Sequence, residues 1–327
     1  MARNKSPLER GVAVLHPIIK EFQEMLAKNP SKPQWESTPA EVRASASSKW
    51  KPEYLGKADA VANIEYRFIN GPTAELPIKI YTPEGIGPFP AVVFFHGGGW
   101  VAGNIELNGV QHQQISHDAR VVVIAVNYQK APEHKFPIPF DDCYATLEWV
   151  AANTQLLNIN PDEIGVAGDS AGGNLALAVA LKARDVQGPK IAFQILIYPA
   201  VDYKFDYPSM IDNATGYSLT TQGMKWYWDQ YMGSSADLDN PYFRPLAESN
   251  FANLPPTFTL TAELDPLRDE GEILAKRLEE AGVHSVLKRY DSLIHGFALM
   301  QGFLPEARTA MRDIAENIQE FLNPRLS

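Results

Sequence analysis

The sequence predicts an α/β fold with a mostly parallel, eight-stranded sheet that helices cover on both faces. Short runs rich in β-branched and apolar residues alternate with longer helical runs along most of the 327 residues. A strand, helix, strand order is typical of a parallel sheet. No Gly/Ser-rich, Pro-rich or repeated segment interrupts this order, so we expect one compact unit.

The elements follow in chain order. Strands are expected at 64–69, 76–81, 91–95, 121–126, in the run before Gly168, and at 191–197, 257–261 and 285–289. The first two, separated by Gly71-Pro72, are typical of a hairpin. Helices are expected at 107–118, 140–153, 171–184, 269–282 and 306–321. Ligands bind at the carboxyl ends of the strands in such sheets.

Two segments stand outside this alternation. In the N-terminal segment 1–57, residues 17–28 predict an amphipathic helix, and a polar stretch follows whose anchors are Trp35, Trp50 and Tyr54. Segment 202–253 predicts no good strand and one helix near 221–232, and it is rich in aromatic residues. We expect both segments to form a cap over a catalytic domain of residues 58–201 and 254–327. The cap aromatics proposed to touch substrate are Tyr203, Tyr217 and Trp226, although most aromatics there could equally anchor the insertion to the core.

Composition limits the function classes. Hydrophobic residues make up 45% of the chain, and the net charge of −10 argues against nucleic acid or an anionic membrane as a partner. Cys143 is the only cysteine, so no internal disulfide can form, which suits a reducing compartment. His16 and Pro17 interrupt the first apolar run, and no run approaches the roughly 20 residues of a membrane span. We expect a cytoplasmic protein without a secretory signal.

The sequence Gly168-Asp169-Ser170-Ala171-Gly172 lies between a predicted strand and a predicted helix. A serine at such a sharp turn needs glycine on both sides, because side chains there would collide. The helix start favours negative charge beside Ser170, and the N–H of Ala171 is a first donor to an oxyanion. The pattern alone arises by chance in roughly one protein of this length in ten. Its strand–turn–helix setting favours a nucleophile.

A serine nucleophile needs a base, and the base needs an acid that orients it. His295 lies in a loop after the last predicted strand, and the small Gly296 permits close approach. Asp265, in the loop after 257–261, is our choice of acid. The competing carboxylates are Glu263, which could still lie in the strand, Asp269 and Glu270, which we expect to cap the next helix, and Asp291, close to the histidine.

The run His96-Gly97-Gly98-Gly99-Trp100 follows the strand expected beside the nucleophile strand. Consecutive glycines let backbone N–H groups turn towards a reacting carbonyl, although a glycine run can also be a plain turn. We expect Gly98 and Gly99, with Ala171, to form the oxyanion hole.

These motifs resemble those of the hormone-sensitive-lipase family of α/β-hydrolases, the bacterial carboxylesterases with His-Gly-Gly-Gly and Gly-Asp-Ser-Ala-Gly. The resemblance runs from about residue 64 to the C-terminus and rests on five motifs: His96 to Trp100 with Gly103, Ala131 to His134 with Phe136-Pro137 and Asp141-Asp142, Gly168 to Gly173, Asp265 to Asp269, and His295-Gly296-Phe297. The chain departs from the family at Gln129-Lys130, where relatives have Arg-Leu, and at Arg244, where a serine is common.

The resemblance implies an α/β-hydrolase fold with a helical cap built from the N-terminal segment and an insertion after the sixth strand. It also implies that His96, Asp169 and Glu133 shape the loops around the site. Members of this family can form homodimers through the last strand or the C-terminal helix, so a homodimer is a candidate assembly.

The expected activity is hydrolysis of short to medium acyl esters, a small-molecule substrate class, by Ser170, His295 and Asp265. No metal or organic cofactor is needed for this chemistry. Two alternatives stay open: an amidase or deacetylase with the same triad, and a non-catalytic ligand receptor on the same fold.

Overall fold

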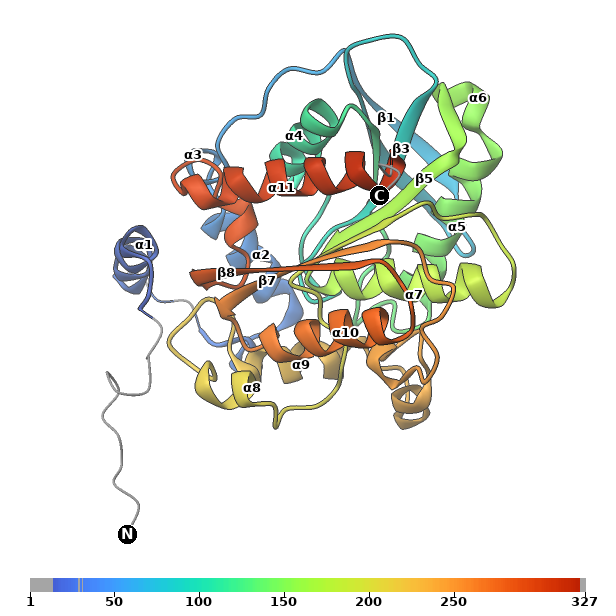
Figure 1. Ribbon diagram of the computed structural model, residues 1–327. Helices are drawn as coiled ribbons and strands as arrows, with labels where there is room; N and C mark the ends of the chain where they lie inside the picture. Colours follow the sequence, from blue (N-terminus) through green and yellow to red (C-terminus); the bar gives the residue numbers. More distant parts are fainter. Residues whose placement is uncertain (1–13, 29, 31, 324–327) are drawn as a thin grey trace.

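Within the described residues 14–28, 30 and 32–323 of this computed structural model, eight strands form one sheet (Figure 1). The spatial order is β1-β2-β4-β3-β5-β6-β7-β8, and β2 runs antiparallel to both of its neighbours while β4 to β8 are parallel. The strands are β1 (Asn63–Asn70), β2 (Glu75–Thr82), β3 (Phe89–Phe95), β4 (Val122–Val126), β5 (Ile159–Asp169), β6 (Gln194–Ile197), β7 (Thr257–Leu264) and β8 (Ser285–Ile294). The predicted mostly parallel, eight-stranded sheet is confirmed.

Helices cover both faces of the sheet, as predicted (Figure 1). One face carries α4 (Gly109–Ala119) and α11 (Pro305–Leu322), with α1 (Pro17–Ala27) packed beside them. The other face carries α5 (Ile138–Ala152), α7 (Ala171–Asp185) and α10 (Arg268–Glu280), and the single turn α6 (Thr154–Leu157) precedes β5.

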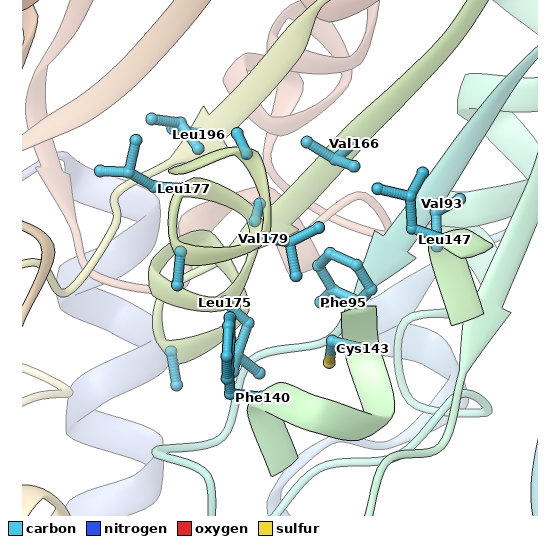
Figure 2. Close-up of a cluster of buried hydrophobic side chains, with 14 of the residues drawn as sticks. Val93, Phe95, Phe140, Cys143, Leu147, Val166, Leu175, Leu177, Val179 and Leu196 are labelled. Atoms are coloured by element: carbon cyan, nitrogen blue, oxygen red, sulfur yellow. The ribbon is translucent and has the colours of Figure 1, made fainter. Parts of the chain in front are cut away.

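The hydrophobic core between the sheet and helices α5 and α7 holds the nucleophile strand in place. Figure 2 shows side chains of β3, β5 and β6 packed against the two helices: Val93, Phe95, Val166, Leu196, Phe140, Cys143, Leu147, Leu175, Leu177 and Val179. All are buried. Because helix α7 is buried along almost its whole length, its first residue is fixed relative to β5.

The N-terminal segment contains a helix that periodicity did not predict. Helix α2 (Pro39–Lys49) buries only Val42 among small and polar residues, so it carries no apolar stripe. Its start does carry a sequence signal, because Thr38 and Glu41 form a capping box around Pro39. A 3₁₀ turn (Gln34–Glu36) precedes α2, and the single turn α3 (Pro52–Leu55) follows it.

The segment between β6 and β7 contains α8 (Pro208–Asp212) and α9 (Thr221–Tyr231), followed by the 3₁₀ turns Ser235–Asp239 and Pro245–Ala247. A last 3₁₀ turn (Phe297–Leu299) follows β8.

The prediction of no secretory signal falls on the first residues of the chain, of which 1–13 lie outside the described part. No helix in the described part is both long and apolar enough to cross a bilayer.

Candidate active site

Ser170 lies at the turn between β5 and α7 with φ 57°, an unusual value for a residue with a side chain. Its backbone N–H donates to the carbonyl of Ile197 at 2.8 Å, which holds the strained turn against β6. A Cβ on Gly168 would overlap the carbonyl of Gly172, and one on Gly172 would overlap the carbonyl of Phe95. Both glycines of the motif are therefore required by backbone packing.

Ser170, His295 and Asp265 meet at the carboxyl ends of β5, β8 and β7. The Nε2 of His295 lies 2.9 Å from the Oγ of Ser170, and its Nδ1 lies 2.7 Å from Oδ2 of Asp265. Asp265 is fully buried, and its Oδ1 accepts the N–H of Leu267 at 2.9 Å. With this carboxylate on Nδ1, the proton of the neutral imidazole belongs there and Nε2 is free to accept the serine proton.

Two side chains that sequence reasoning missed contact His295, one at its ring and one at its backbone. The ring of Tyr198 packs against His295, with 4.7 Å between centroids. The hydroxyl of Ser218, in the segment between β6 and β7, donates to the carbonyl of His295 at 2.7 Å. This contact joins the histidine loop to the predicted cap insertion.

The competing carboxylates have other partners. Glu263 lies in β7 and accepts the N–H of Ser292 at 2.7 Å. Asp269 accepts the N–H of Ser209 at 2.8 Å, and Glu270 accepts that of Val201 at 2.6 Å. Both lie in the first turn of α10 as predicted, but neither makes a capping hydrogen bond there, because both carboxylates bind N–H groups of the segment after β6. Asp291 is exposed on β8.

The glycine loop after β3 is tied to the nucleophile turn through Asp169. Its Oδ1 accepts the N–H of Gly97 at 2.8 Å and the side-chain amide of Asn108 at 2.9 Å, and burial raises its pKa to about 6. His96 stacks on Tyr128, whose hydroxyl donates to the carbonyl of His96 at 2.8 Å, and burial lowers the pKa of this histidine.

Gly98 and Gly99 have φ values of 117° and 61°, which favour glycine. A Cβ on Gly98 would overlap the carbonyl of Ala102, and one on Gly99 would overlap the ring of Tyr227. Within the described part of the chain, the two glycine N–H groups have no hydrogen-bond acceptor. Ala171 is the first residue of α7, where N–H groups lack a partner inside the helix.

Arg43, on α2, connects the N-terminal segment to the loops around the site. Its Nε donates to the carbonyl of Val101 at 2.8 Å, and its Nη2 donates to that of Ala131 at 2.8 Å. The guanidinium also binds both oxygens of Glu133, at 2.9 and 2.5 Å. This pair lowers the pKa of Glu133 to about 2. Sequence reasoning placed Glu133 near the site but missed its partner, which lies about 90 residues away.

A cavity of about 380 Å³ opens onto Ser170 and His295. Both predicted cap segments contribute large apolar side chains to its wall, namely Val42, Trp50, Leu219, Met224 and Tyr227, and Leu107 and Leu299 add to it from outside these segments. The predicted contacts Tyr203, Tyr217 and Trp226 do not line it. Tyr203 binds Asp229 through its hydroxyl at 2.7 Å, Tyr217 packs against the core around α1 and α11, and Trp226 packs edge-on against Tyr227. The rotational phase of α9 turns residues 224 and 227 to the cavity.

The two departures from the family pattern have local partners. Gln129 donates its backbone N–H to Asp142 at 2.9 Å, and Arg244 lies 3.3 Å from Asp202. Among the described residues, one group has the ligand types and proximity of a metal site: Asp59, His117 and Asp118, whose ligand atoms lie within 4.8 Å of one another. None of them lines the cavity.

Comparison with known proteins agrees with this arrangement. A family profile described as alpha/beta hydrolase fold matches residues 92–299. An ethyl acetate hydrolase of Pseudomonas putida is 34% identical over 276 residues, which cover 82% of this chain and 86% of that protein. The carboxylesterase NlhH of Mycobacterium tuberculosis is 36% identical over 241 residues, 72% of this chain and 75% of that protein.

A solved hyperthermophilic esterase from Pyrobaculum calidifontis superimposes with a TM-score of 0.88 and 35% identity, covering 94% of this chain and 99% of that one. The match therefore extends over both the sheet and the segments that surround the cavity. The chain belongs to the α/β-hydrolase fold family, in its hormone-sensitive-lipase-like branch.

Proposed function

We propose that the chain, a carboxylesterase by its family, hydrolyses short to medium acyl esters through an acyl-enzyme formed on Ser170. One observation carries the proposal: the unbroken hydrogen-bonded series from Ser170 through His295 to Asp265, opening onto the cavity. Nucleophile, base and orienting acid in hydrogen-bond contact are the arrangement that activates a serine hydroxyl.

The reaction follows from the positions of the three groups. Nε2 of His295 takes the proton of Ser170 as its Oγ attacks the ester carbonyl, and the resulting imidazolium returns that proton to the leaving alcohol. Water, activated by the same nitrogen, then attacks the acyl-enzyme and releases the acid. Asp265 holds the imidazole in the competent tautomer and stabilises its charged form.

The N–H groups of Gly98, Gly99 and Ala171 stabilise the oxyanion in both steps. The first two belong to a loop anchored by Asp169 and Arg43, and the third begins a helix whose dipole favours negative charge. Fixed donors of this kind need no reorganisation as charge develops.

We further propose that residues 1–57 and 202–253 act together as the cap that sets substrate size. Both segments contribute to the wall of the cavity, and its volume of about 380 Å³ lies near the lower end of the range for small-molecule sites. Each segment contributes a large aromatic side chain to that wall, Trp50 and Tyr227, and the small volume supports short to medium acyl chains.

The test is hydrolysis of p-nitrophenyl acetate, butyrate, hexanoate, octanoate and laurate by the wild type and by Ser170→Ala, with Ser249→Ala, an exposed serine, as control. We expect kcat to fall by several orders of magnitude in Ser170→Ala alone, with butyrate or hexanoate preferred by the wild type. Equal activity of Ser170→Ala would refute the mechanism. Turnover of an anilide but not of the matching ester would assign an amidase instead.

A further inference from the structure

Lys49, the last residue of α2, lines the same cavity as Ser170 and His295. Its Nζ lies 5.3 Å from the centroid of the Trp50 ring. That ring in turn lies against the loop of His295, since a Cβ on Gly296 would lie 3.9 Å from Cζ2 of Trp50. Lys49 and the loop of His295 therefore lie near the same indole ring on the wall of this cavity.

The other charged groups of the cavity wall already have partners. Glu41 accepts the N–H of Thr38 at 2.8 Å and lies 3.7 Å from the Nζ of Lys32. Asp169 is buried and bound to the glycine loop. In the part of the chain that the structure describes, no carboxylate lies within ion-pair distance of Lys49. Its positive charge is thus uncompensated in the free enzyme.

An uncompensated charge in a partly closed site is unfavourable. The Lys49 residue is half-buried, and desolvation by the surrounding protein lowers its pKa to about 8, so about nine in ten molecules still carry the charge at neutral pH. A lysine in the last turn also complements the helix dipole, but that role requires no placement on the cavity wall. An anionic group entering the cavity would supply the missing partner, and its attraction to the ammonium would be stronger there than in water.

We propose that Lys49 is a specificity-determining residue that selects esters carrying a carboxylate, such as half-esters of short dicarboxylic acids. This inference rests on the proposed esterase function. The substrate carboxylate pairs with the ammonium, the hydrocarbon spacer packs on the indole of Trp50, and the ester carbonyl reaches Ser170.

The experiment compares monoethyl adipate with ethyl hexanoate, a pair matched in acyl length, by titration of the released acid at constant neutral pH. It uses the wild type, Lys49→Met, which keeps the chain length without the charge, and Lys49→Arg, which keeps the charge. Lys51→Met is the matched control, because that lysine also stacks over a ring, at 5.8 Å from Tyr54, but does not line the cavity.

We expect the wild type to prefer the half-ester at least tenfold in kcat/KM. That ratio should fall at least tenfold in Lys49→Met, persist in Lys49→Arg and stay at the wild-type value in Lys51→Met. Higher salt should weaken the preference. An equal ratio in the wild type and Lys49→Met, or an equal loss on both esters, would overturn the inference. Failure of the wild type on every ester would instead refute the esterase function itself.

Discussion

Substitution of Arg43 by glutamine tests whether α2, in the proposed cap, controls the glycine loop after β3. The side chain spans three segments, since it binds the carbonyls of Val101 and Ala131 as well as Glu133. Val101 follows Gly99 by two residues. Without the Arg43 guanidinium, the carbonyl of Val101 loses its hydrogen-bond donor, and the loop that carries the proposed oxyanion donors is less firmly held.

The magnitude follows from the exposure of each contact. The side chains of Arg43 and Glu133 are 33% and 54% exposed, so the ion pair contributes about 0.2–1 kcal/mol after solvent screening. Val101 and Ala131 are buried, and each carbonyl left without its donor costs about 1–2 kcal/mol. Together these give a loss of about 2–5 kcal/mol in the free energy of unfolding. Displacing rather than deleting oxyanion donors should lower kcat about tenfold, less than the roughly 100-fold or more for a deleted donor.

The assay measures kcat and KM on p-nitrophenyl butyrate, together with chemical unfolding, for Arg43→Gln and Arg43→Lys. The matched control is Arg67→Gln, because Arg67 pairs with Glu65 at similar exposure, 30% and 35%, but among the described residues it binds only that carboxylate and no loop carbonyl. The control should lose at most about 1 kcal/mol and keep its kcat. Arg43→Lys should lie between, since an amine cannot bind all four acceptors. If the kcat of Arg43→Gln stays within twofold of the wild-type value, α2 does not position the glycine loop, whatever the loss of stability.

The remaining predictions concern the acid, the glycine loop and pH. Asp265→Asn should lower kcat about 10³–10⁴-fold without unfolding the protein. The Oδ1 of the new amide still accepts the N–H of Leu267, but its NH₂ group then faces Nδ1 of His295 and forces the wrong imidazole tautomer. Kinetics measures the loss of kcat and circular dichroism checks the fold, and a loss of kcat below tenfold would contradict the prediction. Gly99→Ala should lower kcat/KM on p-nitrophenyl butyrate at least 100-fold, because the added Cβ would displace the Tyr227 ring. Gly282→Ala is the control: Gly282 also has a positive φ, 80°, but a Cβ there would have no atom within 4 Å, so this variant tests backbone strain alone and should keep its activity. The pKa of Glu133 is lowered from 4.5 to about 2 by its arginine partner, so the pair's stabilisation is present above pH 4.5 and is lost as the pH falls towards 2. Denaturant unfolding should therefore show the gap between wild type and Glu133→Gln narrowing through that range, and a constant gap would contradict the linkage.

The sheet was predictable because its signals are local. Buried parallel strands are continuous apolar runs such as Val122–Val126, and the helices between them have the length and spacing to cover the faces. The observed strand limits differ from the predicted ones where pairing continues beyond the apolar run. Strand β8 was predicted to end at residue 289, but its pairing with β7 continues to Ile294. The capping box of α2 was a usable signal, but α2 has no apolar stripe and was missed.

The sequence by itself was enough to predict that Ser170, Asp265 and His295 lie close together. Each follows a strand directly, and the carboxyl ends of parallel strands meet at one edge of a sheet, so chain order alone brings such residues together. The choice among four neighbouring carboxylates was harder, and only side-chain partners separate Asp265 from Asp269.

Only the tertiary structure decided which residues of the two proposed cap segments line the cavity. Three features depend on how short, weakly patterned segments pack on the sheet and its helices: the face of α9 that meets the cavity, the contacts of Arg43 and the place of Lys49 on the cavity wall. Side-chain phase on such helices is set by long-range packing and not by local preference, so Tyr203, Tyr217 and Trp226 were predicted at the cavity while Trp50, Met224 and Tyr227 line it.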